Sequence, residues 1–359
     1  MMNLAHRFNP NLKSIQAFAL KAQKAKVKLN QNENPFDLPL EIKEKVLQKF
    51  LNEQWNRYPS PAPFELIKKL SEHHGVDSDR IVICNGSNEL IYAIFLALNL
   101  KDAPVLIPQP SFYLYGKITK ILGGRIIEVF LNDDFSFNVD SIAHAIVDNK
   151  PGVVGLCSPN NPGGKSLKFD DVKFLISLSD AIFIIDEAYF EFSSERSAVE
   201  LLDEFSNLIV IRTMSKAFGL AGIRIGYALT SKEIADEIKK VRLPFTIDRF
   251  AELTAIEILN HLDLVKRNVN YIIEQKEWLY NELCKIDEIK VFNTETNFLL
   301  VKVDGGEVVD MLLEEGVAVR DMSSYPMMDK IFRVTVGTFE ENRYFLNALK
   351  KVLTKVKAS

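Results

Sequence analysis

The sequence predicts an α/β protein, with a mostly parallel seven-stranded sheet that carries helices on both faces and a smaller α+β domain after it. Before Pro244, short apolar runs rich in Ile, Val and Phe alternate with longer stretches of helical periodicity, which is typical of parallel strands joined by crossover helices. After Pro244, long helical patterns lead into closely spaced strands. Because a chain of 359 residues exceeds one ordinary domain, we expect an N-terminal arm at 1–35, a large domain at 36–245 and a small domain at 246–359.

The individual strands are predicted from short runs that are rich in Ile, Val or Phe and bounded by turn residues or charges. In the large domain they are Ile81–Cys84, Val105–Pro108, Arg125–Leu131, Val153–Ser158, Ile182–Asp186, Leu208–Arg212 and Arg224–Leu229. Helical periodicity fills most of the intervals, for example at Glu89–Leu98, Phe112–Leu122, Phe169–Leu178 and Val199–Phe205. In the small domain the predicted helices are Arg249–Asn260, Leu262–Leu283 and Glu340–Val356, and the predicted strands are Lys290–Phe292, Phe298–Val303, Ala318–Arg320 and Phe332–Val336.

Composition and charge favour small-molecule chemistry. With 47% hydrophobic and 26% charged residues, the chain has the composition of a globular protein. A formal net charge of -4 gives no general attraction for nucleic acid or an anionic membrane, and no run reaches the roughly 18 apolar residues of a membrane span. The three cysteines are far apart and form no disulfide or metal-ligand pattern. We expect a cytoplasmic protein without a metal site, a membrane span or a nucleic-acid partner.

Unusual polar residues follow several predicted strands, where an open α/β sheet binds its ligands. Gly86, Ser87 and Asn88 follow the first strand and open a helix, whose free N–H groups and dipole favour a phosphate. An ordinary glycine turn with a Ser or Asn cap is the alternative. Asn161 follows the fourth strand in a loop rich in Pro and Gly. Its amide could donate to a phenolate oxygen, or the segment could be only a tight loop.

Asp186 ends the fifth strand, and Tyr189 follows three residues later. A carboxylate at the end of an apolar strand is costly to bury unless it is paired, and a protonated pyridine nitrogen would pair with it. An aspartate in that place keeps the ring cationic, so that the ring can act as an electron sink. Tyr189 is close enough in sequence to reach the same ring. A capping aspartate and a packing tyrosine are the alternative.

Lys216 stands directly after the sixth strand, in the segment TMSKAFGLAGIRIG at 213–226. A lysine among apolar and small residues can be held partly out of water, where its nucleophilic amine becomes accessible, as a Schiff-base lysine requires. The hydroxyls of Thr213 and Ser215 and the guanidinium of Arg224 could converge on a phosphate. For Lys216 alone a solvated surface position is the alternative. Together, however, the phosphate ligands, the pyridinium partner and the lysine fit one cofactor, pyridoxal 5'-phosphate.

Nine motifs in order along the chain point to one family. They are LNQNENP (29–35), RYP (57–59), GSNE (86–89), SPNNPGG (158–164), DEAY (186–189), SKAFGLAGIRIGY (215–227), ETNFLL (295–300), VRD (319–321) and FRVTVGT (332–338). The set resembles the class II pyridoxal-phosphate-dependent aminotransferases of fold type I, and within them the histidinol-phosphate aminotransferases, over essentially the whole chain. Aromatic aminotransferases and a threonine-phosphate decarboxylase share most of these motifs, so the set is less specific for the substrate.

The resemblance implies a role for each candidate residue. The expected catalytic residues are Lys216, which would form the internal aldimine, Asp186, on the pyridine nitrogen, and Tyr189, which with Asn161 would bond the ring hydroxyl. The expected phosphate ligands are Ser87, Asn88, Ser215, Arg224 and, from the neighbouring subunit, Tyr58, so a homodimer is implied. The expected substrate ligands are Arg333, Arg320, Asn161 and Asn32. Without the resemblance, the two arginines would read as surface salt-bridge partners and Tyr58 as a packing residue.

Four positions depart from the family pattern. Phe112 stands where a tyrosine usually covers the cofactor ring, which keeps the aromatic face and removes a hydroxyl. Gly163 replaces the usual threonine of the NNPTG loop, Ser14–Ile15 stands where a Pro-Tyr pair usually faces the substrate, and Thr246 replaces an asparagine. These changes leave transamination intact and leave the amino donor and acceptor open.

The predicted function is transfer of the amino group of L-histidinol phosphate to 2-oxoglutarate, giving imidazole-acetol phosphate and L-glutamate in histidine biosynthesis. An aromatic amino-acid aminotransferase or a phospho-amino-acid decarboxylase on the same scaffold is the alternative. A non-enzymatic cofactor-binding regulator is disfavoured because no helix-turn-helix or basic patch precedes the domain. A nucleotide-dependent oxidoreductase is disfavoured because no GxGxxG follows the first strand.

Overall fold

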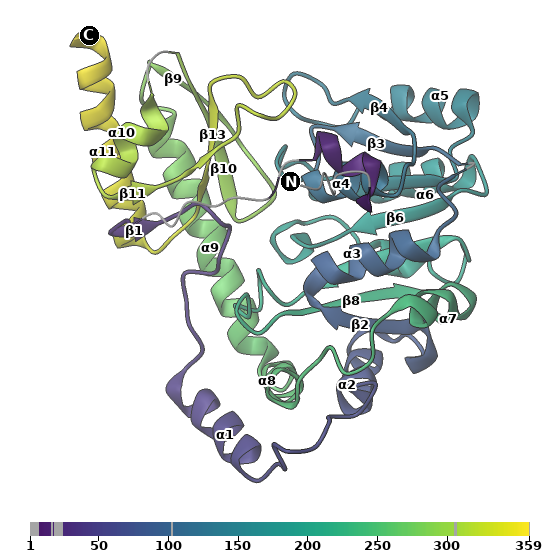
Figure 1. Ribbon diagram of the computed structural model, residues 1–359. Coiled ribbons are helices and arrows are strands. Elements are labelled where there is room, and N and C mark those ends of the chain that lie inside the picture. Colours follow the sequence, from purple (N-terminus) through teal and green to yellow (C-terminus); the bar gives the residue numbers. More distant parts are fainter. Residues whose placement is uncertain (1–6, 16, 18–23, 102, 305–306, 359) are drawn as a thin grey trace.

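The computed structural model describes residues 7–15, 17, 24–101, 103–304 and 307–358. Its largest element is a seven-stranded sheet with the strand order β2-β8-β7-β6-β5-β3-β4 (Figure 1). The strands are β2 (Ile81–Asn85), β3 (Val105–Gln109), β4 (Ile126–Phe130), β5 (Val153–Cys157), β6 (Ile182–Asp186), β7 (Leu208–Thr213) and β8 (Ile225–Thr230). β8 runs antiparallel to both of its neighbours, and the other neighbouring pairs are parallel. All seven predicted strands and the mostly parallel sheet are confirmed.

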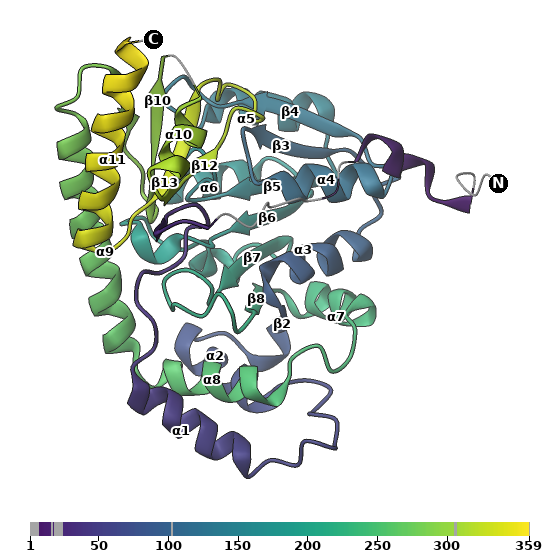
Figure 2. The same cartoon turned by 60° about the vertical axis from the view of Figure 1, so that its left-hand side comes forward.

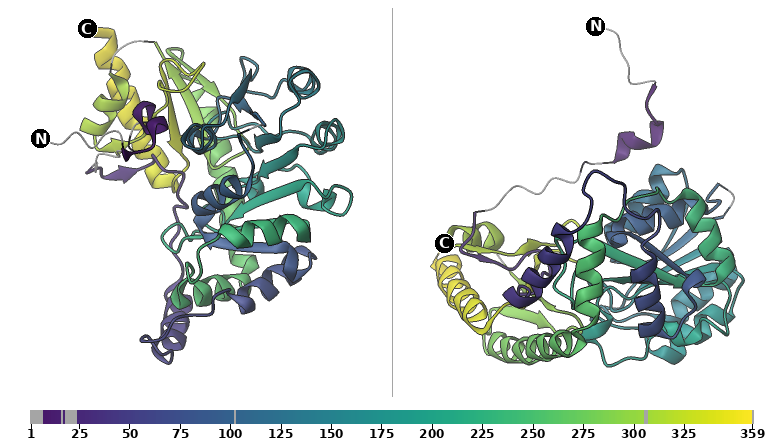
Figure 3. Two further views of the ribbon diagram at one scale, coloured as in Figure 1. Left: turned by 45° about the vertical axis from the view of Figure 1, so that its right-hand side comes forward. Right: turned by 90° about the horizontal axis from the view of Figure 1, so that it is seen from below.

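Helices cover both faces of this sheet, as Figures 2 and 3 show. One face packs against α3 (Gly86–Ala97), α4 (Tyr113–Ile121) and α7 (Lys232–Val241). The other packs against α2 (Phe64–His74), α5 (Val139–Asn149), α6 (Phe169–Ser177) and α8 (Arg249–Leu259). Alternate residues of β7 enter the two cores, with Leu208 and Val210 on one side and Ile209 and Ile211 on the other. The strands read as continuous apolar runs because both of their faces are buried.

The C-terminal part of the chain forms a second, smaller sheet beside the first (Figure 1). This antiparallel sheet has the order β12-β13-β10-β9, with β9 (Ile289–Phe292), β10 (Phe298–Val303), β12 (Arg320–Asp321) and β13 (Ile331–Thr335). A short parallel pair, β1 (Val27–Lys28) and β11 (Val317–Ala318), lies next to it. One face of the small sheet is covered by α9 (Leu262–Leu283), α10 (Val308–Glu314) and α11 (Phe339–Ala358).

Two of the predicted elements are wrong in detail. The helix expected at 199–205 is only a short 3-10 helix, Ala198–Leu201, because its bonds run from Leu202 to Val199 and from Glu204 to Leu201 and the chain turns at once toward β7. The strand expected at 318–320 is divided between β11 and β12, which belong to different sheets. No ranges were predicted from the sequence for α1 (Leu40–Leu51), α2, α5, α7 and α10.

The domain boundaries stay a prediction. α8 packs against α1 and α2, and α9 joins the first core through Val265, Val269 and Ile272 and the second through Leu279 and Leu283, so the chain passes from the first core to the second within α9. β1, which belongs to the expected arm, pairs with β11 of the small sheet. Among the helices that the structure describes, none combines the length and the apolar character that crossing a membrane would need.

Candidate active site

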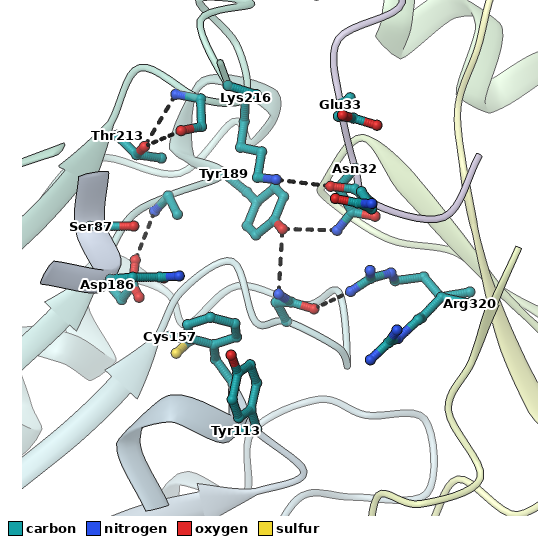
Figure 4. Close-up of a pocket in the computed structure, with 18 of the residues that line it drawn as sticks. Asn32, Glu33, Ser87, Tyr113, Cys157, Asp186, Tyr189, Thr213, Lys216 and Arg320 are labelled. Carbon is teal, nitrogen blue, oxygen red and sulfur yellow. Dashed lines mark hydrogen bonds between the residues drawn. The ribbon is translucent and has the colours of Figure 1, made fainter. Parts of the chain in front are cut away.

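A cavity of about 540 Å³ lies between the two sheets and gathers almost every predicted site residue. Its walls include Ser87, Asn88, Phe112, Asn161, Asp186, Tyr189, Ser215, Lys216, Arg224, Arg320, Arg333 and Asn32. Figure 4 shows several of them pointing into one space from different elements. Of the predicted ligands only Tyr58 does not line the cavity; its side chain is 83% exposed and stacks on Phe245 with ring centroids 4.9 Å apart.

One end of the cavity, which we call the phosphate end, is formed by Ser87, Thr213, Ser215 and Arg224, and Gly86 directly precedes Ser87 in the chain. The register of β8 brings these residues together, because Asn85 lies opposite Ile225 and Thr213 opposite Gly226. The residue that precedes the antiparallel strand β8 therefore stands at the same edge as the carboxyl ends of β2 and β7.

Contacts at the phosphate end leave donors directed at one place. The N-cap residue of the 12-residue helix α3 makes no side-chain capping bond, so the first N–H groups of this helix are available. Arg224, in the left-handed backbone region with φ 63°, donates to the Ser215 hydroxyl at 3.4 Å. Gly86 has φ 76°, and a side chain there would meet the Arg224 guanidinium at 2.2 Å. A guanidinium, hydroxyls and a helix N-terminus together form a donor set that suits a phosphate dianion.

Asp186 lies at the end of β6 in the wall of the cavity. Its two carboxylate oxygens accept bonds from the Ala188 N–H at 3.1 Å and from the Tyr115 hydroxyl at 2.9 Å. Burial raises the pKa of Asp186 to about 6, although both of these bonds act to lower it. In the part of the chain that the structure describes, no Lys or Arg forms an ion pair with this carboxyl group. A cationic ring nitrogen would supply the missing positive charge.

Lys216 reaches into the cavity from the loop after β7, and its Nζ donates to the Gln31 carbonyl at 3.0 Å (Figure 4). Burial, together with the positive charge of Arg333, lowers the pKa of Lys216 to about 8. The loop is tied to the N-terminal segment, because the Asn34 amide donates to the carbonyls of Lys216 and Ala217 at 3.3 and 3.1 Å. The amine is therefore both positioned and more often neutral than that of a surface lysine.

A hydrogen-bonded chain crosses the cavity from Tyr189 to Arg333. The Tyr189 hydroxyl accepts from the Asn32 amide at 2.8 Å and from the Asn161 amide at 3.4 Å, which leaves its own proton to donate to a ligand. Asn161 Oδ1 accepts from Arg333 at 2.6 Å. Since a guanidinium only donates, this bond fixes the amide orientation and turns its Nδ2 toward Tyr189. The Tyr189 hydroxyl and the Asn161 amide thus offer two hydrogen-bond donors to the same part of the cavity.

The opposite end, the substrate end, is formed by Arg320, Met322, Tyr325, Arg333 and Tyr113. Arg320 and Arg333 lie directly opposite each other on β12 and β13, an arrangement that costs free energy for like charges. Arg333 is only 8% exposed and burial lowers its pKa, yet within the described chain no carboxylate pairs with it. A buried cation without a counter-ion is suited to receive an anionic ligand.

The structure adds residues that sequence reasoning missed, notably Tyr113, Tyr325, Met322 and Cys157. Cys157 ends β5 opposite Asp186, so its place at the strand edge was a usable signal. Tyr113 directly follows Phe112 at the start of α4, and Tyr325 lies in the loop between the strands that carry the two arginines. Among the described residues, no three His, Cys, Asp or Glu side chains are grouped as metal ligands.

Three of the four departures from the family pattern can be placed in the structure. At Gly163 a side chain would come within 2.8 Å of Asn160 Oδ1, which accepts a bond from the Gly163 N–H at 2.6 Å, so the loop is packed around a glycine. Thr246 does not line the cavity; its carbonyl accepts from the Asn85 amide at 3.2 Å. Phe112 does line the cavity, at the N-cap of α4.

Comparison with known proteins gives a consistent result. Residues 24–349 match the model of the family "Aminotransferase class I and II". The chain is 45% identical over 344 residues to the histidinol-phosphate aminotransferase of Chlorobaculum parvum, which covers 95% of this chain and 97% of that one. The histidinol-phosphate aminotransferase from Clostridium acetobutylicum superposes with a TM-score of 0.85 at 28% identity, covering 92% of this chain and 99% of that one. The enzyme of that name from Sinorhizobium meliloti, solved in complex with pyridoxal-5'-phosphate, superposes with a TM-score of 0.89 at 24% identity, covering 97% and 98%.

Proposed function

Because the chain belongs to the class I and II aminotransferase family, whose enzymes use pyridoxal 5'-phosphate, we propose that it transfers the amino group of L-histidinol phosphate to 2-oxoglutarate, a step of histidine biosynthesis. The products would be imidazole-acetol phosphate and L-glutamate. The names of the similar proteins support histidinol phosphate as the amino donor. The observation in the structure that carries the proposal is Arg333, which lies beside Arg320. Arg333 is a buried cation, and no carboxylate of the described chain pairs with Arg333.

The residues present fit the cofactor. Ser87, Asn88, Ser215 and Arg224 would hold its phosphate, and the N-terminus of α3 adds free N–H groups. Asp186 would pair with the pyridine nitrogen, and Phe112 would cover one face of the ring. Asn161 and Tyr189 would donate to the ring hydroxyl, since both have a donor directed into the cavity. When bound, pyridoxal phosphate supplies a carbonyl that reacts with amines and a ring that withdraws electrons from the substrate α-carbon.

The chemical steps of the chain itself fall to two residues. Lys216 would be the nucleophilic amine, and once the substrate amine has displaced it, its free amine would take up and hold the proton of the substrate α-carbon. Its pKa of about 8 suits this work near neutral pH, because a general base acts best when its pKa is close to the working pH. Asp186 stabilises positive charge at the ring nitrogen throughout.

Substrate binding falls to the substrate end. Arg333 would receive the carboxylate of glutamate or 2-oxoglutarate and the phosphate of histidinol phosphate in turn, because its planar fork suits both anions. Arg320 would bind the same anions from the opposite strand. Asn32 would contact the substrate from the N-terminal segment, where its backbone N–H already donates to Thr335 at 2.9 Å.

The substrate assignment is tested by measuring kcat/KM with L-histidinol phosphate, L-phenylalanine and O-phosphothreonine, each with 2-oxoglutarate. We expect histidinol phosphate to exceed phenylalanine at least about 100-fold, because a phosphate dianion brings more negative charge to the buried Arg333 than the single carboxylate of phenylalanine does. Equal rates with phenylalanine would support an aromatic aminotransferase instead. Release of carbon dioxide from O-phosphothreonine would support a decarboxylase.

We also propose that the protein acts as a homodimer in which Tyr58 reaches the phosphate of the neighbouring subunit. Tyr58 stands outside its own cavity, and large apolar side chains around it are exposed, among them Trp55 (66%), Phe64 (66%) and Leu243 (67%). A gathering of exposed apolar side chains is typical of a protein interface. Light scattering after gel filtration should give twice the chain mass of 40.8 kDa. The mass of a single chain at micromolar concentration would contradict the proposed homodimer. The cytoplasmic location stays a prediction of the sequence.

A further inference from the structure

We propose that Tyr115 is a positioning residue that holds the carboxylate of Asp186 in place for the pyridine nitrogen of the cofactor. The inference depends on the proposed function, because it needs that cofactor in the cavity. Tyr115 is 1% exposed and does not line the cavity. It therefore acts on the cavity through the residues that it contacts, and its hydroxyl contacts Asp186.

The contacts of Asp186 fix the orientation of its carboxylate. Tyr115 Oη donates to Oδ2 at 2.9 Å, and the Ala188 N–H donates to Oδ1 at 3.1 Å. With one donor on each oxygen, the plane of the carboxylate is set, and lone pairs remain on the cavity side for a further donor. The Ala188 bond is local and comes with the turn after β6. The Tyr115 bond is the one that links the carboxylate to another element, α4.

Packing leaves the Tyr115 ring little room to move. Tyr115 lies in the first turn of α4, and its ring packs on the backbone of β5, where a side chain at Gly155 would stand 3.6 Å from it. Phe95 of α3 and Phe112 flank it, with ring centroids 5.9 and 6.5 Å away. Phe112, which lines the cavity, and Tyr115 belong to the same helical turn. One turn of α4 thus supplies both a wall for the cofactor ring and the support of its nitrogen ligand.

The surroundings make this support necessary. Burial disfavours the ionised carboxyl group of Asp186, and so does the neighbouring charge of Glu187, which is itself paired with Arg212 at 2.8 Å. The other titratable neighbours, Cys157 and Tyr189, stay neutral because burial raises the pKa of both. The Tyr115 bond is the largest of the contributions that lower the pKa of Asp186. A positioned, ionised carboxylate is the form that pairs with a pyridinium.

The chain offers a matched control for a test of Tyr115. Tyr227 is also 1% exposed, and its hydroxyl forms one partly buried hydrogen bond, with His74 Nε2 at 2.9 Å. Tyr115→Phe and Tyr227→Phe therefore each remove one buried hydroxyl and one hydrogen bond and keep the ring. Loss of stability should be similar in the two variants. Only Tyr115→Phe should weaken the binding of a ligand that carries the pyridine ring.

The experiment uses the apoenzyme and 4'-deoxypyridoxine 5'-phosphate, which has the pyridine ring and the phosphate and cannot react with Lys216. Calorimetric titration at pH 7.5 should give about tenfold weaker binding for Tyr115→Phe, because a hydrogen bond to a charged group is lost, and binding within about twofold of wild type for Tyr227→Phe. In the Asp186→Asn background, Tyr115→Phe should weaken binding no further, since the amide that replaces the carboxylate has no charge to hold. For Tyr115→Phe alone, kcat should fall with KM for histidinol phosphate nearly unchanged.

The outcomes separate this inference from the proposed function. Equal affinities for Tyr115→Phe and Tyr227→Phe, or an unchanged effect of Tyr115→Phe in the Asp186→Asn background, would overturn the role of Tyr115 and leave the proposed function standing. Failure of the wild-type apoenzyme to bind the probe would overturn the proposed function, and the role of Tyr115 with it. Tyr115→Met, which also lacks the hydroxyl, repeats the comparison if Tyr115→Phe does not fold.

Discussion

The phosphate end and the substrate end of the cavity are built in different ways. At the phosphate end, each side chain stands within a few residues of a strand of the seven-stranded sheet, and strand register alone brings Ser87, Ser215 and Arg224 together. At the substrate end, Arg333 and Arg320 come from the small sheet and Tyr113 from α4. One end depends on a single sheet, and the other on how two sheets pack together. We therefore expect substitutions that change how the two sheets pack to affect substrate choice more than cofactor binding.

The largest effect on activity is expected from substitution of Lys216, which lines the cavity. Lys216→Ala should lower kcat more than about 10⁴-fold, because the nucleophile and the proton carrier are lost together. The absorption band of the lysine-bound cofactor should disappear with it. Lys276→Ala is the control, since Lys276 also donates to a backbone carbonyl, Thr294 O at 2.6 Å, but is buried outside the cavity. Full transaminase activity in Lys216→Ala would refute the assignment.

At the substrate end, Arg333→Lys should lower kcat/KM for histidinol phosphate about 100-fold, because an ammonium group cannot replace the planar fork or the bond to Asn161 at 2.6 Å. Arg320→Lys should cost about tenfold, since Arg320 is less buried. Steady-state kinetics on both variants shows which of the two substitutions causes the larger loss of kcat/KM. A larger loss for Arg320→Lys would mean that the principal anion site is on β12.

At the phosphate end, Gly86→Ala should weaken pyridoxal phosphate binding about tenfold, because the added methyl group displaces the Arg224 guanidinium, which stands 2.2 Å from its position. Gly75→Ala is a matched control, with a similar φ of 66° and nothing within 4 Å of the added carbon. Both variants should lose about 1 kcal/mol of stability through backbone strain. Reconstitution of the two variant apoenzymes with cofactor measures their affinities for pyridoxal phosphate. Equal affinities would show that Arg224 does not bind the cofactor phosphate.

The smallest effect concerns the pH dependence of apoenzyme stability. Burial lowers the pKa of Lys216 from 10.5 to about 8, so the unfolded chain binds more protons in this window and stability should rise from pH 8 to 10.5. Burial raises the pKa of Asp186 from 3.8 to about 6, so the folded chain binds more protons there and stability should fall as pH rises from 4 to 6. Urea denaturation of Lys216→Met and Asp186→Asn should each lose one of these slopes. Persistence of both slopes in both variants would contradict the burial of the two groups.

The same contrast explains how far the sequence could be interpreted. The seven strands and the residues at their ends were predictable, because a buried parallel strand is a continuous apolar run and ligands bind where such strands end. Tyr113 and Tyr325 were not, because their place in the cavity depends on contacts between α4 and the loop after β12. The bond from Tyr115 to Asp186 was also beyond the sequence, since it joins residues 71 positions apart across β5. The helix expected at 199–205 failed because periodicity does not show how soon the chain must turn toward the next strand.

The central claim, that this chain moves an amino group between histidinol phosphate and 2-oxoglutarate through a cofactor bound at Lys216, is tested most directly by single-turnover spectroscopy of the holoenzyme. Addition of L-histidinol phosphate alone should remove the absorption band of the lysine-bound cofactor and release one equivalent of imidazole-acetol phosphate per active site. Addition of 2-oxoglutarate alone to the enzyme that remains after this first half-reaction should restore the band and yield one equivalent of glutamate. A band that histidinol phosphate leaves unchanged, while another amine removes it, would contradict the claim.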